Sequence, residues 1–230
     1  MKITWLGHSG FRIEIEDQVL LVDPWIAGNP VFPEGQEDAA IAGATAILIS
    51  HGHGDHAANA ATIASTYRIP IACIHELSKS AAFEGLETIG FGKGGTIALG
   101  GAQVSMVTAS HSSSIDFDGE GLSVAGSEAG FMIKGEGHTI YFSGDTDIMA
   151  DMQWFGEYYA PDIGILCAGG HYTMDMKAAA WAAKKYFDFK TVIPCHYKTF
   201  PLLAQTADEM ISALPGIDVK TPEVLETIEI

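Results

Sequence analysis

Three histidines and one aspartate lie within six consecutive residues, in the segment Ser50-His51-Gly52-His53-Gly54-Asp55-His56. Neutral imidazole nitrogens and carboxylate oxygens are the ligands that zinc and related divalent metals prefer in proteins. The glycine spacers leave the backbone free to turn, so that the four side chains can converge on a small volume. A helix would place ligands two residues apart on different sides. We therefore predict a metal-binding loop between the apolar run 46–49 and a helix that begins near residue 57.

Three further candidate ligands follow stretches that are predicted to be strands. His111 comes shortly after 103–108, Asp145 after 138–142, and His196 after 191–194. The loop alone supplies four ligands, which is not a complete site for two metal ions. Three residues of the right type, each after a strand and in this order, would complete the site.

Two divalent ions held ~3.5–4 Å apart can share one water molecule and lower its pKa from about 15.7 to about 7. The result is a metal-bound hydroxide at neutral pH, together with cations that polarise a carbonyl or phosphoryl oxygen. Histidines bind metal only as neutral imidazoles, so we expect activity to fall below about pH 6.

These ligands require strands that end at the site. Stretches rich in β-branched and aromatic residues, bounded by Gly or Pro, predict strands at 2–6, 11–15, 19–22, 46–49, 69–74, 96–99, 103–108, 130–134, 138–142, 163–166, 191–194 and within 219–228. Helices are predicted at 57–67, 77–83, 148–155, 174–187 and 204–214. Two polar segments, 24–43 and 112–127, are predicted to be long loops that act as lids or binding elements. A run of strands leads to a strand–loop–helix unit in each half, which indicates a layered α/β (α+β) fold.

Composition narrows the class of protein. With 230 residues, 47% of them hydrophobic, the chain suits one domain over 1–230. The formal charge of −17 leaves no basic face for long nucleic acids, so we expect a small-molecule substrate. No apolar stretch approaches the ~20 residues that cross a membrane. Cys73, Cys167 and Cys195 are widely spaced and are expected to be buried free thiols, which favours a cytoplasmic location.

The His-x-His-x-Asp-His pattern resembles the metal-binding motif of the metallo-β-lactamase superfamily of hydrolases. The resemblance implies a four-layer αβ/βα sandwich with the metal site at one edge of two packed sheets. It also implies the partition of ligands: one metal on His51, His53 and His111, a second on Asp55, His56 and His196, and Asp145 as the bridge. A relative with a redox di-iron centre has Glu at the second loop position. His53 stands there in this chain, so we expect two Zn²⁺ ions, with Mn²⁺, Ni²⁺ or Fe²⁺ as alternatives.

Other short segments narrow the resemblance, namely Thr4-Trp5-Leu6-Gly7-His8-Ser9-Gly10-Phe11, Asp23-Pro24, Gly144-Asp145-Thr146 and Pro194-Cys195-His196-Tyr197-Lys198-Thr199-Phe200-Pro201. Together they look like the subgroup of metal-dependent hydrolases related to bacterial ascorbate-6-phosphate lactonase. The resemblance spans nearly the whole chain. It implies a metal-dependent hydrolase and makes a homo-oligomer a further hypothesis.

Four residues outside the ligand set have candidate roles, and the ligand Asp55 has a second one. Asp55 is expected to orient the hydroxide as well as bind metal, and Asp23 to accept a hydrogen bond from a ligand histidine. His171 is a candidate catalytic residue, as an extra ligand or substrate contact, or else a plain loop residue. Lys198 would bind a substrate phosphate or carboxylate, unless it is only solvated. His8 lies either at the edge of the site or in a structural turn.

The function that we predict is a dinuclear metal-dependent hydrolase. A metal-bound hydroxide would attack a small substrate, expected to be anionic, at a lactone, another ester or a phosphoester. A phosphodiesterase acting on nucleotides is the alternative within enzymes. A non-catalytic metal- or ligand-binding protein with the same fold is the alternative outside them.

Overall fold

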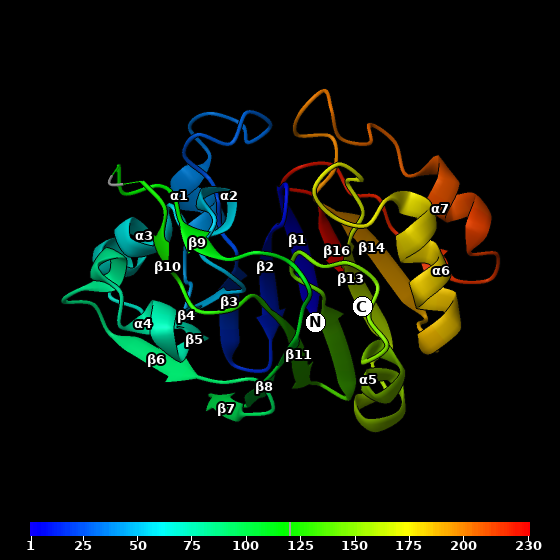
Figure 1. The fold of residues 1–230 in the computed structure, drawn as a ribbon, viewed down its shortest axis with the longest axis horizontal. Coiled ribbons are helices and arrows are strands. Elements are labelled where there is room, and N and C mark those ends of the chain that lie inside the picture. Colours follow the sequence, from blue (N-terminus) through cyan, green and yellow to red (C-terminus); the bar gives the residue numbers. More distant parts are fainter. Residues whose placement is uncertain (120) are drawn as a thin grey trace.

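Two seven-stranded sheets packed face to face form the centre of the molecule, with helices on both outer faces (Figure 1). This arrangement comes from a computed structural model, which describes residues 1–119 and 121–230. The layers run helix, sheet, sheet, helix, so the predicted four-layer αβ/βα sandwich is confirmed.

The first sheet has the strand order β16-β1-β2-β3-β4-β5-β6. Pairing is antiparallel from β16 to β3 and parallel from β3 to β6. The strands are β1 Lys2–Gly7, β2 Gly10–Ile15, β3 Gln18–Val22, β4 Ala46–Ile49, β5 Ile71–Ile74, β6 Thr88–Phe91 and β16 Thr227–Glu229. Every residue of β4 and β5 is buried, as expected for parallel strands covered on both faces.

The second sheet repeats this arrangement with the order β15-β14-β13-β12-β11-β8-β7. Pairing is antiparallel from β7 to β12 and parallel from β12 to β15. The strands are β7 Thr96–Leu99, β8 Ala102–Thr108, β11 Ala129–Gly135, β12 His138–Phe142, β13 Ile163–Cys167, β14 Thr191–Cys195 and β15 Asp218–Val219. A separate two-stranded ribbon joins β9 Ser114–Ile115 and β10 Ser123–Val124.

Helices α3 and α4 pack on the first sheet, and α5, α6 and α7 lie on the side of the second (Figure 1). Their bounds are α1 Glu37–Ile41, α2 Gly54–Ala57, α3 Ala60–Tyr67, α4 His75–Ser78, α5 Met152–Tyr159, α6 Met176–Tyr186 and α7 Asp208–Ala213, with a 3₁₀ turn at Ala81–Phe83. Asp175 caps α6 by accepting a hydrogen bond of 2.7 Å from the Ala178 backbone N–H. Among the described residues, every helix is too short or too polar to cross a membrane.

Aromatic side chains join the two sheets across the core. Phe11 on β2 meets Phe142 on β12 with ring centroids 6.2 Å apart, and Phe91 on β6 stacks on Phe131 of β11 at 6.3 Å. Rings of this size bury much apolar surface and hold the sheets at a fixed distance. The three cysteines are buried and free, as predicted.

Some predicted boundaries are wrong. The helix predicted at 57–67 is divided into α2 and α3, which are separated by Ala58 and Asn59. The Asn59 side chain, just before α3, accepts a 2.6 Å hydrogen bond from the Ile26 backbone N–H. The helix predicted at 148–155 begins later, at Met152, and extends to Tyr159. The helix at 77–83 is replaced by two shorter turns, and the helix at 204–214 by α7 alone.

Four short elements, α1, β6, β9 and β10, were not predicted. Helix α1 lies within the segment 24–43, which was predicted to be a loop throughout. β6 includes Gly90 and lies at the edge of its sheet, so its sequence lacks the apolar run of a central strand. The segment 112–127 was predicted to be a loop, but it contains β9 and β10; residue 120 lies outside the described residues.

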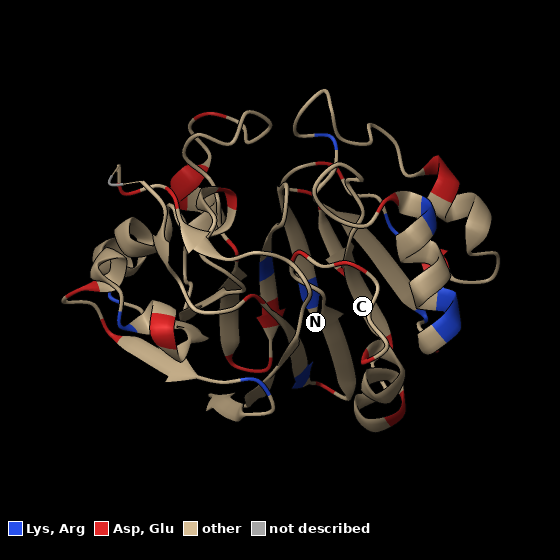
Figure 2. Ribbon diagram, in the orientation of Figure 1, with Lys and Arg blue, Asp and Glu red and all other residues tan. Residues whose placement is uncertain are grey.

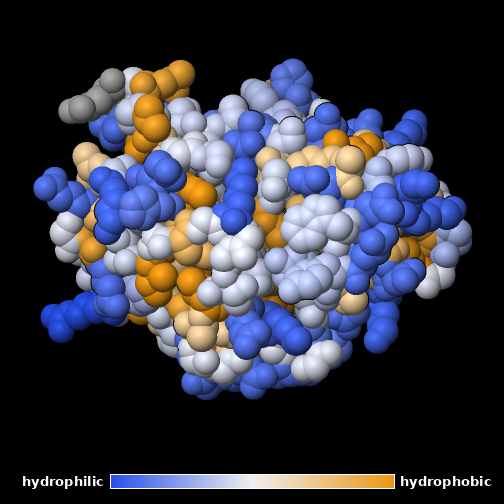
Figure 3. Space-filling view, turned by 60° about the horizontal axis from the view of Figure 1, so that its bottom comes forward, coloured by the Kyte–Doolittle hydropathy of each residue, from blue (hydrophilic) through white to orange (hydrophobic). Residues whose placement is uncertain are grey.

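Acidic residues are spread over the ribbon, whereas Lys and Arg are few and scattered, with Lys184 and Lys185 in the last turn of α6 (Figure 2). Cations at that end interact favourably with the helix dipole. The face shown in Figure 3 is mostly hydrophilic, with apolar residues in small separate groups. This face therefore lacks the large continuous apolar patch that marks an obligate interface.

Candidate metal centre

All seven predicted ligands lie at one edge of the sandwich, where strands of both sheets end. The segment after β4 in the first sheet supplies four of them. The other three follow β8, β12 and β14 of the second sheet. In mixed sheets of this kind, ligands bind beyond the carboxyl ends of the parallel strands. The site therefore belongs to both sheets at once.

One group of ligands, called here the first cluster, consists of His51, His53 and His111. One ring nitrogen from each lies within 4.8 Å of the others. His51 Nε2 is 3.0 Å from His53 Nδ1, and the His111 ring is 5.3 Å from both of their rings. Three imidazoles that converge in this way can hold one divalent ion.

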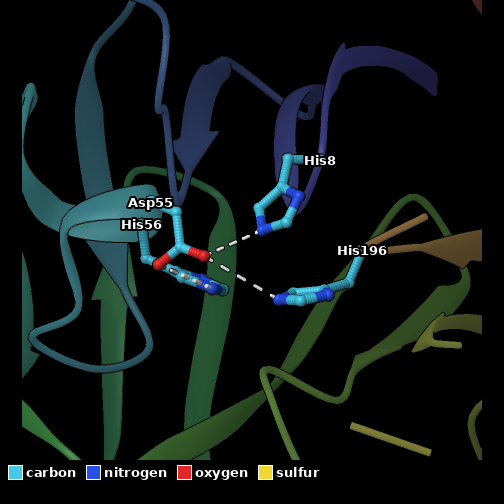
Figure 4. Close-up of side chains that lie close together, drawn as sticks. All are labelled: His8, Asp55, His56 and His196. Atoms are coloured by element: carbon cyan, nitrogen blue, oxygen red, sulfur yellow. Dashed lines mark hydrogen bonds and ion pairs between the residues drawn. The ribbon is translucent and has the colours of Figure 1, made fainter. Parts of the chain in front are cut away.

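The second cluster consists of His8, Asp55, His56 and His196, whose ligand atoms also lie within 4.8 Å of one another. Figure 4 shows the four side chains pointing toward one another from the end of β1, from α2 and from the end of β14. His196 Nε2 lies 3.9 Å from Asp55 Oδ2, and His56 Nε2 lies 3.9 Å from Asp55 Oδ1. These separations exceed hydrogen-bond length and leave room for an ion.

Asp145 lies between the two clusters. Its Oδ2 is 3.4 Å from His56 Nε2, 3.7 Å from His111 Nε2 and 3.1 Å from His196 Nε2. Asp145 Oδ1 and His56 Nε2 are buried and make no hydrogen bond among the described residues. Buried polar atoms without a partner destabilise a fold unless a ligand satisfies them. The donor set and these unpartnered atoms fit two divalent metal ions with Asp145 between them.

Asp23 at the end of β3 holds the histidines in place. Its Oδ2 accepts a 2.8 Å bond from His56 Nδ1 and a 2.5 Å bond from Ser50 Oγ. Ser50 Oγ is in turn 3.0 Å from His51 Nδ1, so one carboxylate orients a ligand in each cluster. The structure shows the hydrogen bond to Asp23 that was predicted, and adds Ser50, which sequence reasoning missed. Carboxylates in this position fix the ring orientation and raise the basicity of a ligand.

Comparison with known proteins agrees with the fold and with the candidate metal centre. Residues 2–196 match the family model for the β-lactamase superfamily domain. The chain belongs to the metallo-β-lactamase superfamily. It is 64% identical over 229 residues to a UPF0173 metal-dependent hydrolase of Paracoccus denitrificans, and the match covers 99% of each chain. Within the superfamily it is therefore a UPF0173 metal-dependent hydrolase.

Solved structures of the superfamily share this fold. A metallo hydrolase from the archaeon Ignicoccus hospitalis is 33% identical, with a TM-score of 0.86 over 99% of this chain and 97% of that one. A metallo-β-lactamase fold protein from Bacillus subtilis has a TM-score of 0.74 at 17% identity, with 99% of each chain covered. The similarity to the Bacillus subtilis protein supports the shared fold only.

The two clusters of this hydrolase differ in protonation. Burial lowers the pKa of His51 well below its usual value, and burial also lowers the pKa of His111. Burial opposes the charged form of His56 as well, but the carboxylates of Asp145, Asp55 and Asp23 outweigh it and raise the pKa of His56 well above its usual value. The lowered pKa values favour the neutral, metal-binding form of His51 and His111, whereas His56 must first lose a proton.

The two ligand carboxylates stay ionised. Burial tends to raise the pKa of Asp145, but His196 and His56 outweigh it and hold that pKa well below its usual value. Burial has the same tendency at Asp55, and the charge of His56 and the hydrogen bond from His8 outweigh it there. Ionised carboxylates beside neutral imidazoles form the donor set that divalent metals bind.

Two glycines are required by close packing at the site. A Cβ on Gly52 would come within 2.5 Å of Ala125 Cβ and 3.0 Å of the Ser114 carbonyl oxygen, because these two residues lie directly on the metal-binding segment. Gly52 does not adopt a positive φ, so the turn freedom invoked from the sequence is the wrong reason for this residue. A Cβ on Gly169 would clash with the carbonyl oxygen of His196. Only glycine allows the backbone to approach this ligand so closely.

The predicted metal-binding loop is also shorter than expected. Asp55 and His56 lie on the first turn of α2, which begins at Gly54. Successive helical residues point in directions about 100° apart. Asp55 therefore reaches toward His8, while His56 reaches toward Asp23 and Asp145.

His8 lies inside the centre and not in a plain surface turn. It is fully buried, its Nε2 is 3.0 Å from Asp55 Oδ2, and its Nδ1 is 2.9 Å from Thr199 Oγ1. Burial lowers the pKa of His8 to about 4. A single histidine after a strand was the only sequence signal for it.

Four residues around the site have left-handed backbone conformations that non-glycine residues rarely adopt. They are His8 with φ 52°, Asp23 with φ 45°, His196 with φ 58° and Lys198 with φ 65°. His8, Asp23 and His196 directly follow β1, β3 and β14, so the left-handed conformation turns the chain sharply where each of these strands ends.

His171 and Lys198 do not reach the metal ligands in this structure. His171 is exposed and packs edge-on against Tyr172, with ring centroids 4.6 Å apart. Lys198 Nζ pairs with Glu223 at 3.1 Å, and both line a separate cavity. Neither residue lines the cavity over the metal centre.

Proposed function

We propose that the chain is a dinuclear hydrolase that cleaves small esters, lactones or phosphoesters. The observation that carries this proposal is the position of Asp145, whose Oδ2 faces ring nitrogens of both clusters. Two bound divalent ions, expected to be Zn²⁺, would supply an activated water and polarise the oxygen of the bond to be cleaved. Water then adds across an ester or lactone bond to give a carboxylic acid and an alcohol.

Asp55 would orient the attacking water as well as bind metal. His8 holds its Oδ2 at 3.0 Å, and Asp55 lines the cavity in which the substrate would lie. A carboxylate fixed by a buried donor reorganises little during reaction, which favours the transition state. His8 is a positioning residue in this scheme, because it acts on the reacting groups through Asp55.

His171 and Lys198 stay proposed substrate contacts. Lys198 would have to leave Glu223, and His171 would have to turn away from Tyr172, before either could reach a molecule at the metals. The expected anionic substrate would otherwise depend on the metal ions for attraction. The small-molecule partner, a homo-oligomer and a cytoplasmic location also stay predictions, as does kinship with ascorbate-6-phosphate lactonase.

A phosphodiesterase acting on nucleotides is the second candidate. Trp25 and Phe200 lie side by side over the centre with ring centroids 6.0 Å apart and could stack on a base. A non-catalytic metal-binding protein is the third, but such a protein would not need two clusters that open into a cavity.

Metal analysis and a substrate panel test these proposals. We expect about two metal equivalents per chain, and hydrolysis of at least one compound in a panel of lactones, aryl phosphodiesters and cyclic nucleotides. His53→Ala should abolish activity on any substrate found, because it removes a ligand of the first cluster. A protein that binds no metal and resists reconstitution would exclude the dinuclear proposal, and a loaded protein without any activity would favour the binding protein.

A further inference from the structure

A cavity of about 590 Å³ opens over the metal centre. Its floor is formed by metal ligands of both clusters. Its walls carry four aromatic side chains, Trp25, Phe117, Tyr172 and Phe200. Three of them are half-buried, and Tyr172 is 56% exposed, so their faces are available to a bound molecule.

Two of these rings are fixed to the metal centre. Trp25 and Phe200 both meet the ring of His8 edge-on, with centroids 5.4 Å and 5.8 Å away. His8 is fully buried and bonded to Asp55, the residue that would orient the attacking water in the proposed function. The aromatic surface is therefore already in place beside the bond that would be cleaved.

Phe117 is held by a different contact. The preceding residue, Asp116, accepts a 2.7 Å hydrogen bond from the Gly54 backbone N–H at the start of α2. An ideal Cβ on Gly54 would lie 3.4 Å from Phe117 Cβ, so the two segments are in van der Waals contact. The segment 112–127 thus brings both an apolar ring and a carboxylate to the wall.

The cavity offers little to a negatively charged group away from the metals. None of its described lining residues is Lys or Arg, and apart from the metal ligands its one ionisable acid is Asp116. The formal charge of the whole chain is −17. A phosphate or carboxylate placed against these walls would lose its hydration beside Asp116 and gain no cation in return.

Resting on the hydrolase function above, we propose that the substrate is an uncharged carbonyl ester or lactone that carries an aromatic or other bulky apolar group. That group would lie against Trp25 and Phe200, with the carbonyl at the metal centre. Hydrolysis breaks the bond between the carbonyl carbon and the ester oxygen, water supplies a hydroxyl to the carbon, and its remaining proton goes to the alcohol. The proposal replaces the expected anionic substrate with an uncharged one, and a negative charge appears only on the acid product.

Three para-nitrophenyl esters with one leaving group test the proposal in the zinc-loaded protein. We expect kcat/KM to be highest for the phenylacetate, about tenfold lower for the acetate, and lower still for the negatively charged hemisuccinate. A hemisuccinate that reacts as fast as the phenylacetate would overturn the proposal. So would a cyclic nucleotide that reacts faster than all three esters.

Variants of the cavity-wall residues test whether these residues cause the preference for the phenylacetate over the acetate. Trp25→Ala and Tyr172→Ala should each reduce the ratio of kcat/KM for phenylacetate over acetate several-fold, with about two metal equivalents retained. Trp181→Ala removes a tryptophan that is 52% exposed on α6 and lines none of these walls, so the ratio should stay at the wild-type value. Asp116→Asn should raise the relative rate of the hemisuccinate. The proposal would be overturned if Trp25→Ala, Tyr172→Ala and Asp116→Asn all left the relative rates of the three esters unchanged.

Binding separates failure of this proposal from failure of the proposed function. Phenylacetamide and acetamide are matched uncharged probes, and succinamate is the matched anion. We expect the loaded protein to bind phenylacetamide most tightly by NMR titration, and Trp25→Ala to weaken that binding. If no ester is hydrolysed but this order holds, the hydrolase function fails and the apolar cavity stands. Hydrolysis of esters together with tightest binding of succinamate would leave the function intact and overturn the substrate class.

Discussion

The two metal-binding clusters have different surroundings although they share Asp145. The first cluster contains imidazoles only, and both His53 and His111 are partly exposed. The second cluster includes the Asp55 carboxylate, and its three histidines are almost completely buried. Asp23 contacts the second cluster directly but reaches the first only through Ser50.

This difference predicts which of the two clusters binds its metal ion more tightly. The partly buried carboxylate of Asp55, whose side chain is 30% exposed, attracts a cation more strongly than neutral imidazoles do, because solvent screens its charge only in part. We therefore infer that the second cluster holds its metal more tightly at neutral or higher pH, and that the first cluster exchanges its metal more readily. The following predictions test that inference, from the largest expected effect to the smallest.

Loss of the shared carboxylate should have the largest effect. In Asp145→Asn we expect metal content to fall from two equivalents to one or fewer, and kcat/KM to fall by at least about a hundredfold, since even residues that only support a ligand give losses of 10–100-fold. Metal analysis after gel filtration measures the metal content, and steady-state kinetics measures kcat/KM. Retention of two equivalents would show that the clusters do not depend on a bridge.

Acidification should empty the second cluster. Burial opposes the charged form of His56, but three carboxylates raise its pKa well above the usual value, so metal must displace a proton there. Metal affinity should therefore decrease as the pH falls below the raised pKa of His56, by up to about tenfold for each pH unit, with activity decreasing below about pH 6. Competition with a chelator of known affinity measures this slope. An affinity that does not change with pH would contradict the raised pKa.

Asp23→Asn should weaken metal binding without removing a ligand. We expect a loss of about 10–100-fold in affinity, larger at the second cluster than at the first. Isothermal titration with Zn²⁺ measures the affinity of each cluster. Asp162→Asn is the matched control, because Asp162 accepts a 2.7 Å bond from His138 away from the site. Equal losses of metal affinity in both clusters would contradict the inference that Asp23 supports the second cluster more than the first.

Lys198→Ala and His171→Ala should have the smallest effects. Lys198 is paired with Glu223 and His171 is exposed, so neither contacts a ligand in the described structure. We expect less than about a threefold change in kcat/KM, in line with the small energies of exposed ion pairs. A tenfold loss with unchanged metal content would instead place the residue at the substrate.

The sequence was most informative where residue type alone limits chemistry. Three histidines and an aspartate spaced by glycine suit few roles besides metal binding, and the downstream ligands follow strands with clear apolar runs. The resemblance then supplied the sandwich and the partition between metals. The positions of these residues in the fold agree with that picture, while metal binding itself stays a prediction.

Other features depend on contacts between distant residues, which a local pattern does not record. The bond from His8 to Asp55 spans 47 residues, and that from Gly54 to Asp116 spans 62. The need for Gly52 arises from Ala125 and could not be inferred from its neighbours in sequence. The aromatic cavity wall has the same origin, since its four rings come from separate segments.

The left-handed residues around the site have a consequence for engineering. His8, Asp23, His196 and Lys198 each hold a conformation that costs a non-glycine residue about 1–3 kcal/mol. Four such positions are a substantial fraction of the ~5–15 kcal/mol by which a domain is stable. A search for thermostable variants would favour glycine or asparagine at these positions, and at His8, Asp23 and His196 such substitutions would dismantle the centre while improving the fold. Selection for stability alone therefore works against activity in this protein, and these three positions should be held constant in any such library.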